Sequence, residues 1–250
     1  MTAVEIWKPA VPYRNMSLEE FAKHVRMDAR EVRRLAERGK LPGNKVAGQW
    51  RFNRARVTEW LQQEMHKLDE RRLVALERSM GGITPDSVDE SRTVITDLIG
   101  LEGIDLALPA RTRPSVLRRL VRIAERTGFL YDPAGLLQAL EERERLHSTA
   151  LPNGVAIPHP RQPMPYVSSE PFICVARASS GIVFGAAGQQ LTRLFFLICC
   201  HTDRYHLHVL ARLMRVLDEE LIDDILRAES REDLLELLIA KENRVVSQKK

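Results

Sequence analysis

The sequence predicts two domains: an α/β domain in roughly the last two thirds of the chain, preceded by a small helical domain that contains a β-hairpin. Three observations support this prediction. After residue 93, segments with helical periodicity alternate with short apolar strands, which is typical of an α/β sandwich around a mixed sheet. Before residue 80, two short amphipathic helices lead into a hairpin pattern and a third helix. Between the two regions, residues 81–92 have the glycine, proline and polar residues of a linker.

Charge is unevenly distributed along the 250 residues. Residues 1–80 carry 17 Lys and Arg against 11 Asp and Glu, whereas residues 81–250 carry 21 against 23. This asymmetry predicts a basic module that faces nucleic acid, joined to a near-neutral one. No apolar run reaches the roughly eighteen residues of a membrane-spanning helix, the N-terminus lacks a signal-peptide pattern, and the three cysteines lack metal-ligand spacing. We therefore expect a cytoplasmic protein without a membrane segment.

Local signals place the elements of the first domain. Ser17, with Glu20 three residues later, has the pattern of a capping box and predicts the start of the first helix. Asp28 can cap a second helix, which Gly39 would end. Residues 41–52 alternate apolar residues with turn formers and predict a hairpin, after which Asn53 can cap a third helix. A buried stripe is predicted for the first helix at Leu18, Phe21, Ala22 and Val25.

This order of elements defines a small winged helix-turn-helix domain. Residues 17–22 and 48–52 resemble the helix start and the wing of the excisionase and MerR-like DNA-binding families. The resemblance implies DNA as a partner, with the second helix in the major groove and the hairpin at the adjacent backbone. A solvated basic face on a protein-interaction helix is the alternative. The residues expected to contact DNA are Arg30, Arg33, Arg34, Arg38, Lys45 and Arg51.

Residues 58–80 are compatible with one continuous helix whose apolar residues recur at nearly coiled-coil spacing. Two interpretations stay open: a connector helix that forms a homodimer, or a helix that packs on its own domain. We place the first domain at residues 1–80, the linker at 81–92 and the second domain at 93–250. The apolar residues of the connector are Leu61, Met65, Leu68, Leu73, Leu76 and Met80.

The elements of the second domain alternate as an α/β sandwich requires. The predicted helices are residues 93–99, 115–125, 134–145, 205–217, 221–228 and 233–242. The predicted strands are residues 104–108, 172–178, 182–184 and 191–200, with 179–181 as a turn between the second and third.

One further strand, residues 154–157, ends at Pro158, which has no N–H to donate to a sheet. His159 therefore lies where a strand ends and the chain turns, a common position for a reactive side chain. Its imidazole can be a neutral nucleophile near pH 7, because the unperturbed pKa is about 6.5. Taken alone, the same position also fits an ordinary surface histidine.

The context favours the reactive interpretation. Residues 140–159 resemble the active-site region of the type-2 IIA domains of the bacterial phosphotransferase system, both sugar-specific and nitrogen-related, and the resemblance extends over residues 90–243. It implies a mixed-sheet α/β sandwich and an HPr-type phosphocarrier protein that phosphorylates His159. It also implies that Arg143 and His206 steady the phosphoryl charge and that Thr149 supplies a nearby hydroxyl. It implies no cofactor; a zinc site of His201, His206 and His208 is the weaker alternative.

Together the two resemblances predict a regulator whose DNA or partner binding changes when His159 is phosphorylated. Pro160 departs from the family, which mostly has glycine after the active histidine, and it removes a backbone donor that Arg161 could replace. The alternative is therefore a protein that is not phosphorylated and uses the IIA fold as a sensing scaffold. A transport-coupled phosphotransferase whose basic domain binds a protein is a third interpretation.

Overall fold

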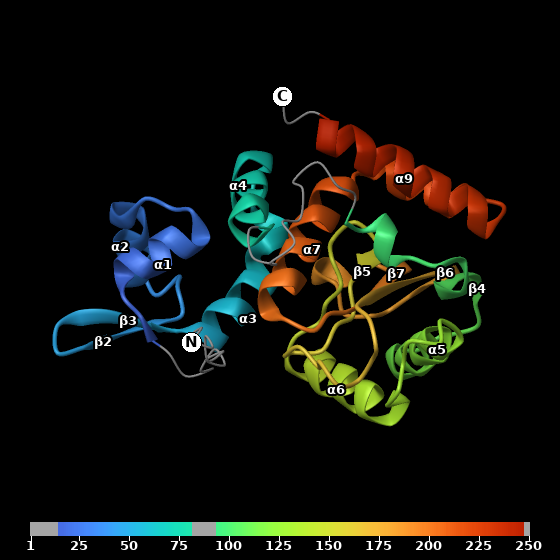
Figure 1. The fold of residues 1–250 in the computed structure, drawn as a ribbon, viewed down its shortest axis with the longest axis horizontal. Coiled ribbons are helices and arrows are strands. Elements are labelled where there is room, and N and C mark those ends of the chain that lie inside the picture. Colours follow the sequence, from blue (N-terminus) through green and yellow to red (C-terminus); the bar gives the residue numbers. More distant parts are fainter. Residues whose placement is uncertain (1–14, 82–93, 248–250) are drawn as a thin grey trace, which may run out of the picture. The chain divides into compact units, whose positions relative to one another are not determined.

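The computed structural model describes residues 15–81 and 94–247, and it divides into two compact units, residues 1–64 and 65–250 (Figure 1). The expected lead-in before residue 15 and nearly all of the expected linker lie outside the described residues. Among the residues described, no helix has the length and apolar character needed to cross a bilayer.

The first unit has the expected order of helix, helix, hairpin and helix. Its three-stranded sheet has the order β1-β3-β2, with both pairings antiparallel. The elements are β1 (Asn15–Met16), α1 (Leu18–Val25), α2 (Ala29–Glu37), β2 (Gly43–Val46), β3 (Gln49–Asn53) and α3 (Arg54–Glu64).

The predicted caps of this unit are confirmed. Ser17 and Glu20 form a complete capping box, and the Asp28 carboxylate accepts from the N–H groups of Arg30 and Glu31. Gly39 takes a left-handed φ of 66° at the end of α2, and the Asn53 side chain accepts from the N–H of Arg56 at 3.2 Å. The predicted stripe of α1 is buried throughout. These local signals position α2 and the hairpin on one small core.

The second unit is a mixed α/β sandwich, as predicted. Its four-stranded sheet has the order β4-β6-β7-β5, in which β6 and β7 are antiparallel and the outer pairs are parallel. Helices α5 and α6 cover one face, and α7 and α9 lie over the other (Figure 1). The strands are β4 (Ile104–Leu108), β5 (Val155–Ala156), β6 (Phe172–Ile182) and β7 (Thr192–Cys199). The helices are α4 (Glu70–Gly81), α5 (Arg113–Arg126), α6 (Pro133–Leu146), α7 (Asp203–Val216), α8 (Glu219–Arg227) and α9 (Arg231–Ser247), with 3₁₀ turns η1 (Met65–Lys67), η2 (Thr96–Leu98), η3 (Leu101–Gly103) and η4 (Ala187–Gln189).

Two local predictions for this unit were wrong. Residues 172–184 do not form two strands around a turn, because β6 continues through residues 179–181 and pairs again with β7 at Ile182. The pairing register shifts between Arg177 and Ile182, and this irregularity accommodates residues 179–181 within the strand. The helix expected over residues 93–99 is only the 3₁₀ turn η2.

The connector also differs from the prediction of one continuous helix. Helix α3 ends at Glu64, and Asp69 starts α4 by accepting from the N–H of Arg72 with its side chain and from that of Leu73 with its carbonyl. Helix α4 packs on α7, and Leu73, Leu76 and Met80 are buried. Helix α4 thus lies in the second compact unit, and the apolar seam considered for a homodimer is largely filled within one chain.

Candidate functional site

His159 lies at the end of the edge strand β5, which runs parallel to β7. Gly154, with a φ of 80°, turns the chain into this strand. Beyond the strand, the carbonyl of Pro158 accepts from the N–H of Ile198 at 3.0 Å and holds the chain against β7. His159 is thereby fixed to the sheet, and its side chain is only 3% exposed.

The hydrogen bonds of His159 define which ring nitrogen carries the proton. Its Nδ1 lies 2.7 Å from the carbonyl oxygen of Ile157. Because a carbonyl can only accept, Nδ1 carries the proton of the neutral ring, and Nε2 keeps a free lone pair. Nε2 is buried and has no hydrogen-bond partner among the described residues. A buried acceptor without a partner is costly, so this nitrogen is a candidate reactive atom.

His206 faces His159 from the first turn of α7. The ring centroids are 4.8 Å apart at an interplanar angle of 49°, and Nε2 of His206 also lacks a partner in the described part of the chain. Thr202 caps the helix by accepting from the N–H of Tyr205 at 3.2 Å. The positive end of the helix dipole therefore lies at the histidine pair and favours an anion there.

Burial keeps both rings neutral. Desolvation, followed by the neighbouring His206 and Arg143, holds the pKa of His159 well below its ordinary value. Desolvation and then Arg143 lower the pKa of His206 to about 3. At neutral pH the site therefore offers two uncharged imidazoles, and Nε2 of each has no hydrogen-bond partner among the described residues.

Arg143 and Thr149 approach the site from the end of α6. The Arg143 guanidinium is buried, acts electrostatically on both histidines, and donates through Nη1 to the carbonyl of His147 at 2.6 Å. Thr149 is buried too, but its hydroxyl donates to the Glu144 carboxylate. The structure thus brings His159, His206 and Arg143 together, whereas Thr149 is engaged with another residue.

Glu144 is a site residue that the sequence did not reveal. Its buried carboxylate accepts from the Thr149 hydroxyl and from the Thr149 N–H at 3.2 Å. The Thr149 carbonyl in turn accepts from the N–H of Ile157 at 3.1 Å, next to the carbonyl that holds His159 Nδ1. Desolvation raises the pKa of Glu144, while the Thr149 hydrogen bonds oppose this shift. In sequence, Glu144 belongs to a run of charged residues that predicts an exposed helix face.

Comparison with known proteins identifies this domain. Residues 97–241 match the family model for the phosphoenolpyruvate-dependent sugar phosphotransferase system, EIIA 2, which is more than half of the chain. The chain belongs to this family. We call residues 97–241 the IIA domain.

The relatives include sugar-specific and nitrogen-related proteins. The fructose-specific EIIA component of Haloferax volcanii is 30% identical over 149 residues, which is 58% of this chain and 95% of that protein. A nitrogen regulatory protein of Bradyrhizobium diazoefficiens is 34% identical over 137 residues, covering 54% of this chain and 86% of that protein. The crystal structure of IIA mannitol from Escherichia coli has 26% identity and a TM-score of 0.51, covering 56% of this chain and 98% of that one.

The N-terminal unit presents arginines on one face of α2. Arg30, Arg33 and Arg34 are exposed and follow the i, i+3, i+4 spacing of a helix face, and Arg38 lies at the C-cap. On the hairpin, Lys45 lies 5.4 Å from the Trp50 ring centroid. Residues 16–65 match the family model for a helix-turn-helix domain, so the chain joins such a domain to a IIA domain.

Arg51, predicted to reach DNA from the hairpin, is half-buried and held locally. Its Nη2 donates to the Gln49 side chain at 2.6 Å, and its Nη1 donates to the Trp50 carbonyl at 3.1 Å. The structure therefore places this side chain along the hairpin strand, in contrast to the exposed arginines of α2.

The remaining histidines of the IIA domain have separate partners. His201 Nε2 lies 3.1 Å from the Ser168 hydroxyl, and His208 Nδ1 donates to the Glu77 carbonyl at 3.1 Å. His147 is exposed. The three residues considered for zinc, His201, His206 and His208, are thus each engaged in a different environment.

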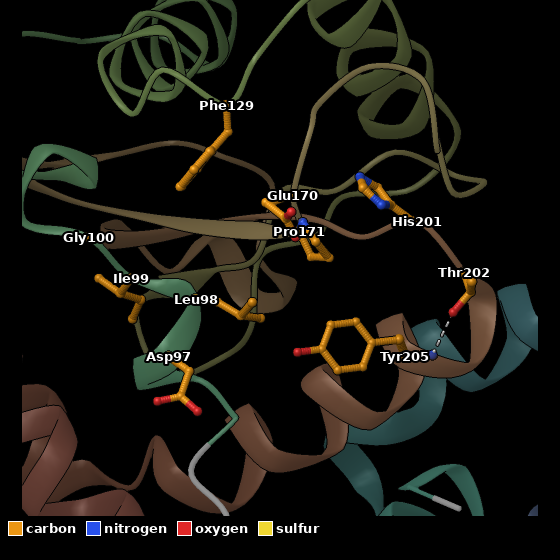
Figure 2. A pocket seen from close by; sticks show the side chains of 10 residues that line it. All are labelled: Asp97, Leu98, Ile99, Gly100, Phe129, Glu170, Pro171, His201, Thr202 and Tyr205. Carbon is orange, nitrogen blue, oxygen red and sulfur yellow. Dashed lines mark hydrogen bonds between the residues drawn. The ribbon is translucent and has the colours of Figure 1, made fainter. Parts of the chain in front are cut away.

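A cavity of about 640 Å³ opens beside the first turn of α7, and neither His159 nor His206 lines it (Figure 2). The side chains of Phe129 and Tyr205 reach toward it from two different elements (Figure 2). Its wall is mainly apolar, with Asp97, Glu170 and His201 among the polar side chains.

Pro160 and Arg161 follow His159 in the chain. Pro160 is buried and supplies no N–H, whereas Arg161 is exposed. The α7 N-terminus, Arg143 and His206 lie near His159 and have the charge or polarity to stabilise an anion there.

Proposed function

We propose that the IIA domain accepts a phosphoryl group on Nε2 of His159 from an HPr-type phosphocarrier protein. The observation that carries this proposal is the fixed tautomer of His159, with Nδ1 bound to the Ile157 carbonyl and Nε2 buried without a partner. The lone pair of Nε2 forms the new N–P bond while the N–P bond of the donor phosphohistidine breaks. The donor ring recovers its electron pair, and no proton needs to leave Nδ1.

Three groups support the transferred charge. Arg143 supplies a fixed positive charge that already acts on both rings. A dianion beside His206 raises the pKa of that ring, so that it can take up a proton and donate to a phosphoryl oxygen. The N-terminus of α7 adds the positive end of its dipole.

Glu144 and Thr149 act in this proposal as positioning residues. Their hydrogen bonds fix residue 149, whose carbonyl fixes Ile157, whose own carbonyl fixes the His159 tautomer. Thr149 therefore contributes through the backbone and does not need to touch phosphate.

We further propose that the helix-turn-helix domain binds DNA and that the phosphorylation state of His159 changes this binding or the binding of a protein partner. The exposed arginines of α2 and the match to a helix-turn-helix family support the DNA contact. The addition of nearly two negative charges to the IIA domain supplies the signal.

A second candidate is a sensing domain that takes up no phosphate. Two observations favour it: Pro160 removes a backbone donor, and the side chains of His159 and His206 are only 3% and 5% exposed. A phosphocarrier would need these rings to become accessible. The experiment that follows separates the two candidates.

The test is incubation of the full chain with phosphoenolpyruvate, enzyme I and HPr-type carriers, followed by mass spectrometry of the acid-labile phosphate. We expect one phosphate on His159, absent in His159→Ala and retained in the matched control His147→Ala, whose histidine is exposed. No phosphate with any carrier would leave the sensing domain as the function. Mobility shifts of both protein forms on genomic DNA fragments then measure the effect on DNA binding.

A further inference from the structure

Helix α4 is joined to α7 by a buried ionic cluster centred on Glu77. Glu77 is 0% exposed, and its Oε1 accepts from Arg212 Nε at 2.8 Å and Nη2 at 2.5 Å. Its Oε2 accepts from Arg215 Nη1 at 2.5 Å. Both carboxylate oxygens are thus used by arginines of α7, which is the geometry that a desolvated ion pair requires.

The cluster extends to other elements of the second unit. Arg212 Nη1 donates to Glu242 of α9 at 3.0 Å, and Arg215 Nε donates to Glu70 of α4 at 2.7 Å. Glu242 also accepts from the N–H groups of residues 94–96 at 2.8 to 3.0 Å. Helix α4 is therefore an integral layer on α7.

The carboxyl end of α4 meets the turn of α7 that carries His206. Arg204 donates through Nε to the Met80 carbonyl at 2.7 Å and through Nη2 to the Ser79 carbonyl at 2.8 Å. His208 Nδ1 donates to the Glu77 carbonyl at 3.1 Å. His206 lies between Arg204 and His208 in sequence, so one helical turn holds α4 and also forms the histidine pair.

Electrostatics predicts whether a phosphoryl group on His159 strengthens or weakens the contact between α4 and α7. The last carbonyls of a helix form the negative end of its dipole, and here they point at the first turn of α7 together with the Glu77 backbone. A phosphoryl group on His159 brings nearly two more negative charges to the same turn. The negative end of the α4 dipole and a phosphoryl group on His159 would both lie at this turn of α7, so each makes the other less favourable there.

We propose that α4 is the output element of the histidine site: phosphorylation of His159 weakens the hold of α7 on α4. This inference rests on the proposed function. Helix α4 follows α3 of the helix-turn-helix domain after only residues 65–69, so a change at α4 acts directly on the chain that leads to that domain. Both ends of the coupling can be measured separately.

The first measurement is amide hydrogen exchange of the full chain, unphosphorylated and phosphorylated, with phosphate stoichiometry determined by mass spectrometry. We expect the protection of amides in α4 to fall at least about tenfold on phosphorylation while α5 keeps its protection. Phosphorylated protein with unchanged or increased protection in α4 would overturn the inference and leave the proposed function intact. An equal loss in α5 would also overturn it, because it would indicate general loosening.

The second measurement tests the coupling without any phosphate. Arg204→Ala removes the donors to the end of α4, and Arg126→Ala is a matched control, since Arg126 donates to two other backbone carbonyls of the domain, Glu102 and Ile104, both at 3.2 Å. We expect imidazole NMR signals of His159 and His206 to shift in Arg204→Ala and to stay in place in Arg126→Ala. Signals that are unchanged in both variants would overturn the coupling. Shifted signals in a protein that takes up no phosphate would retain the coupling and reject the phosphorelay.

Discussion

At the scale of single residues, the geometry of the site depends on hydrogen bonds that do not touch Nε2 of His159. The His159 ring is oriented by one carbonyl, and that carbonyl is held by a chain of contacts that begins at Glu144. Carboxylates accept hydrogen bonds from both N–H and O–H groups, so Glu144 can satisfy both donors of Thr149 at once. Loss of this acceptor would leave the buried N–H and hydroxyl of Thr149 without a hydrogen-bond partner.

We expect Thr149→Val to slow phosphorylation of His159 by roughly tenfold to a hundredfold, because small misplacements of a reacting group are costly. It should also lower the free energy of unfolding by about 1–3 kcal/mol, since the Glu144 carboxylate loses a donor. Single-turnover transfer from a phosphorylated carrier and denaturant unfolding measure the two effects. Thr149→Ser keeps the hydroxyl and should restore most of the rate. Equal rates in Val and Ser variants would contradict the positioning role.

The buried histidines make stability depend on pH. Their pKa values are lower in the folded protein than in the unfolded chain, so the unfolded chain binds more protons as the pH falls below about 6.5. Each histidine should therefore reduce the free energy of unfolding by up to about 1.4 kcal/mol per pH unit below that value, until its folded pKa is reached. Denaturant unfolding between pH 7 and 5 should give a smaller slope for His206→Gln than for the wild type. Identical slopes would show that His206 titrates normally.

At the scale of elements, α2 and the hairpin are defined by local rules. Helix α2 buries Val32 and Ala36 while its arginines stay exposed, as an amphipathic recognition helix requires. The hairpin turns at Ala47 and Gly48, both with positive φ (49° and 78°), which suits a tight two-residue turn.

We expect replacement of Arg30, Arg33 and Arg34 by alanine to weaken DNA binding by at least tenfold and to reduce its dependence on salt. Each lost phosphate contact should lower the slope of log affinity against log salt by about 0.9. Binding titrations at several salt concentrations measure both quantities. The control is Arg118→Ala with Arg122→Ala, two exposed arginines at i, i+4 spacing on α5. An equal loss in the control would indicate a non-specific charge effect.

At the scale of the whole molecule, α4 contributes to the stability of the unit that contains the IIA domain. It contributes Leu73, Leu76 and Met80 to the buried residues, and Glu77 to the buried charges. Its removal would leave Arg212 and Arg215 without the carboxylate that both contact, and an unpaired buried charge is among the costliest defects in a fold.

We therefore propose residue 65 as the start of the second domain and predict a stability difference between two fragments. A fragment of residues 65–250 should exceed one of residues 94–250 by about 3–5 kcal/mol in the free energy of unfolding, which is the usual cost of removing one partner of a buried ion pair. Denaturant titration of both fragments measures this difference. Equal stabilities would return the domain boundary to the linker at residues 81–92.

Local sequence patterns were sufficient to predict the features that neighbouring residues control. Caps at Ser17, Asp28 and Asn53 act over two or three residues. The strand expected over residues 154–157 is shorter in the structure, where β5 ends at Ala156. The pattern around His159 was sufficient to indicate a IIA domain, which the family match confirms. Helix and strand periodicity gave the α/β class because it reports burial on one face.

Which charged residues are buried depends on contacts between segments that are distant in sequence. Glu77 and Arg212 are 135 residues apart in sequence, and both carry side chains that usually face solvent, so no local pattern distinguishes them from a surface charge. The same holds for Glu144, whose role appears only when the backbone of residue 149 is placed against it. Desolvation depends on the residues that surround a side chain in three dimensions. Because a buried carboxylate requires hydrogen-bond or ionic partners, Glu144 holds residue 149 in place and Glu77 holds α4 on α7.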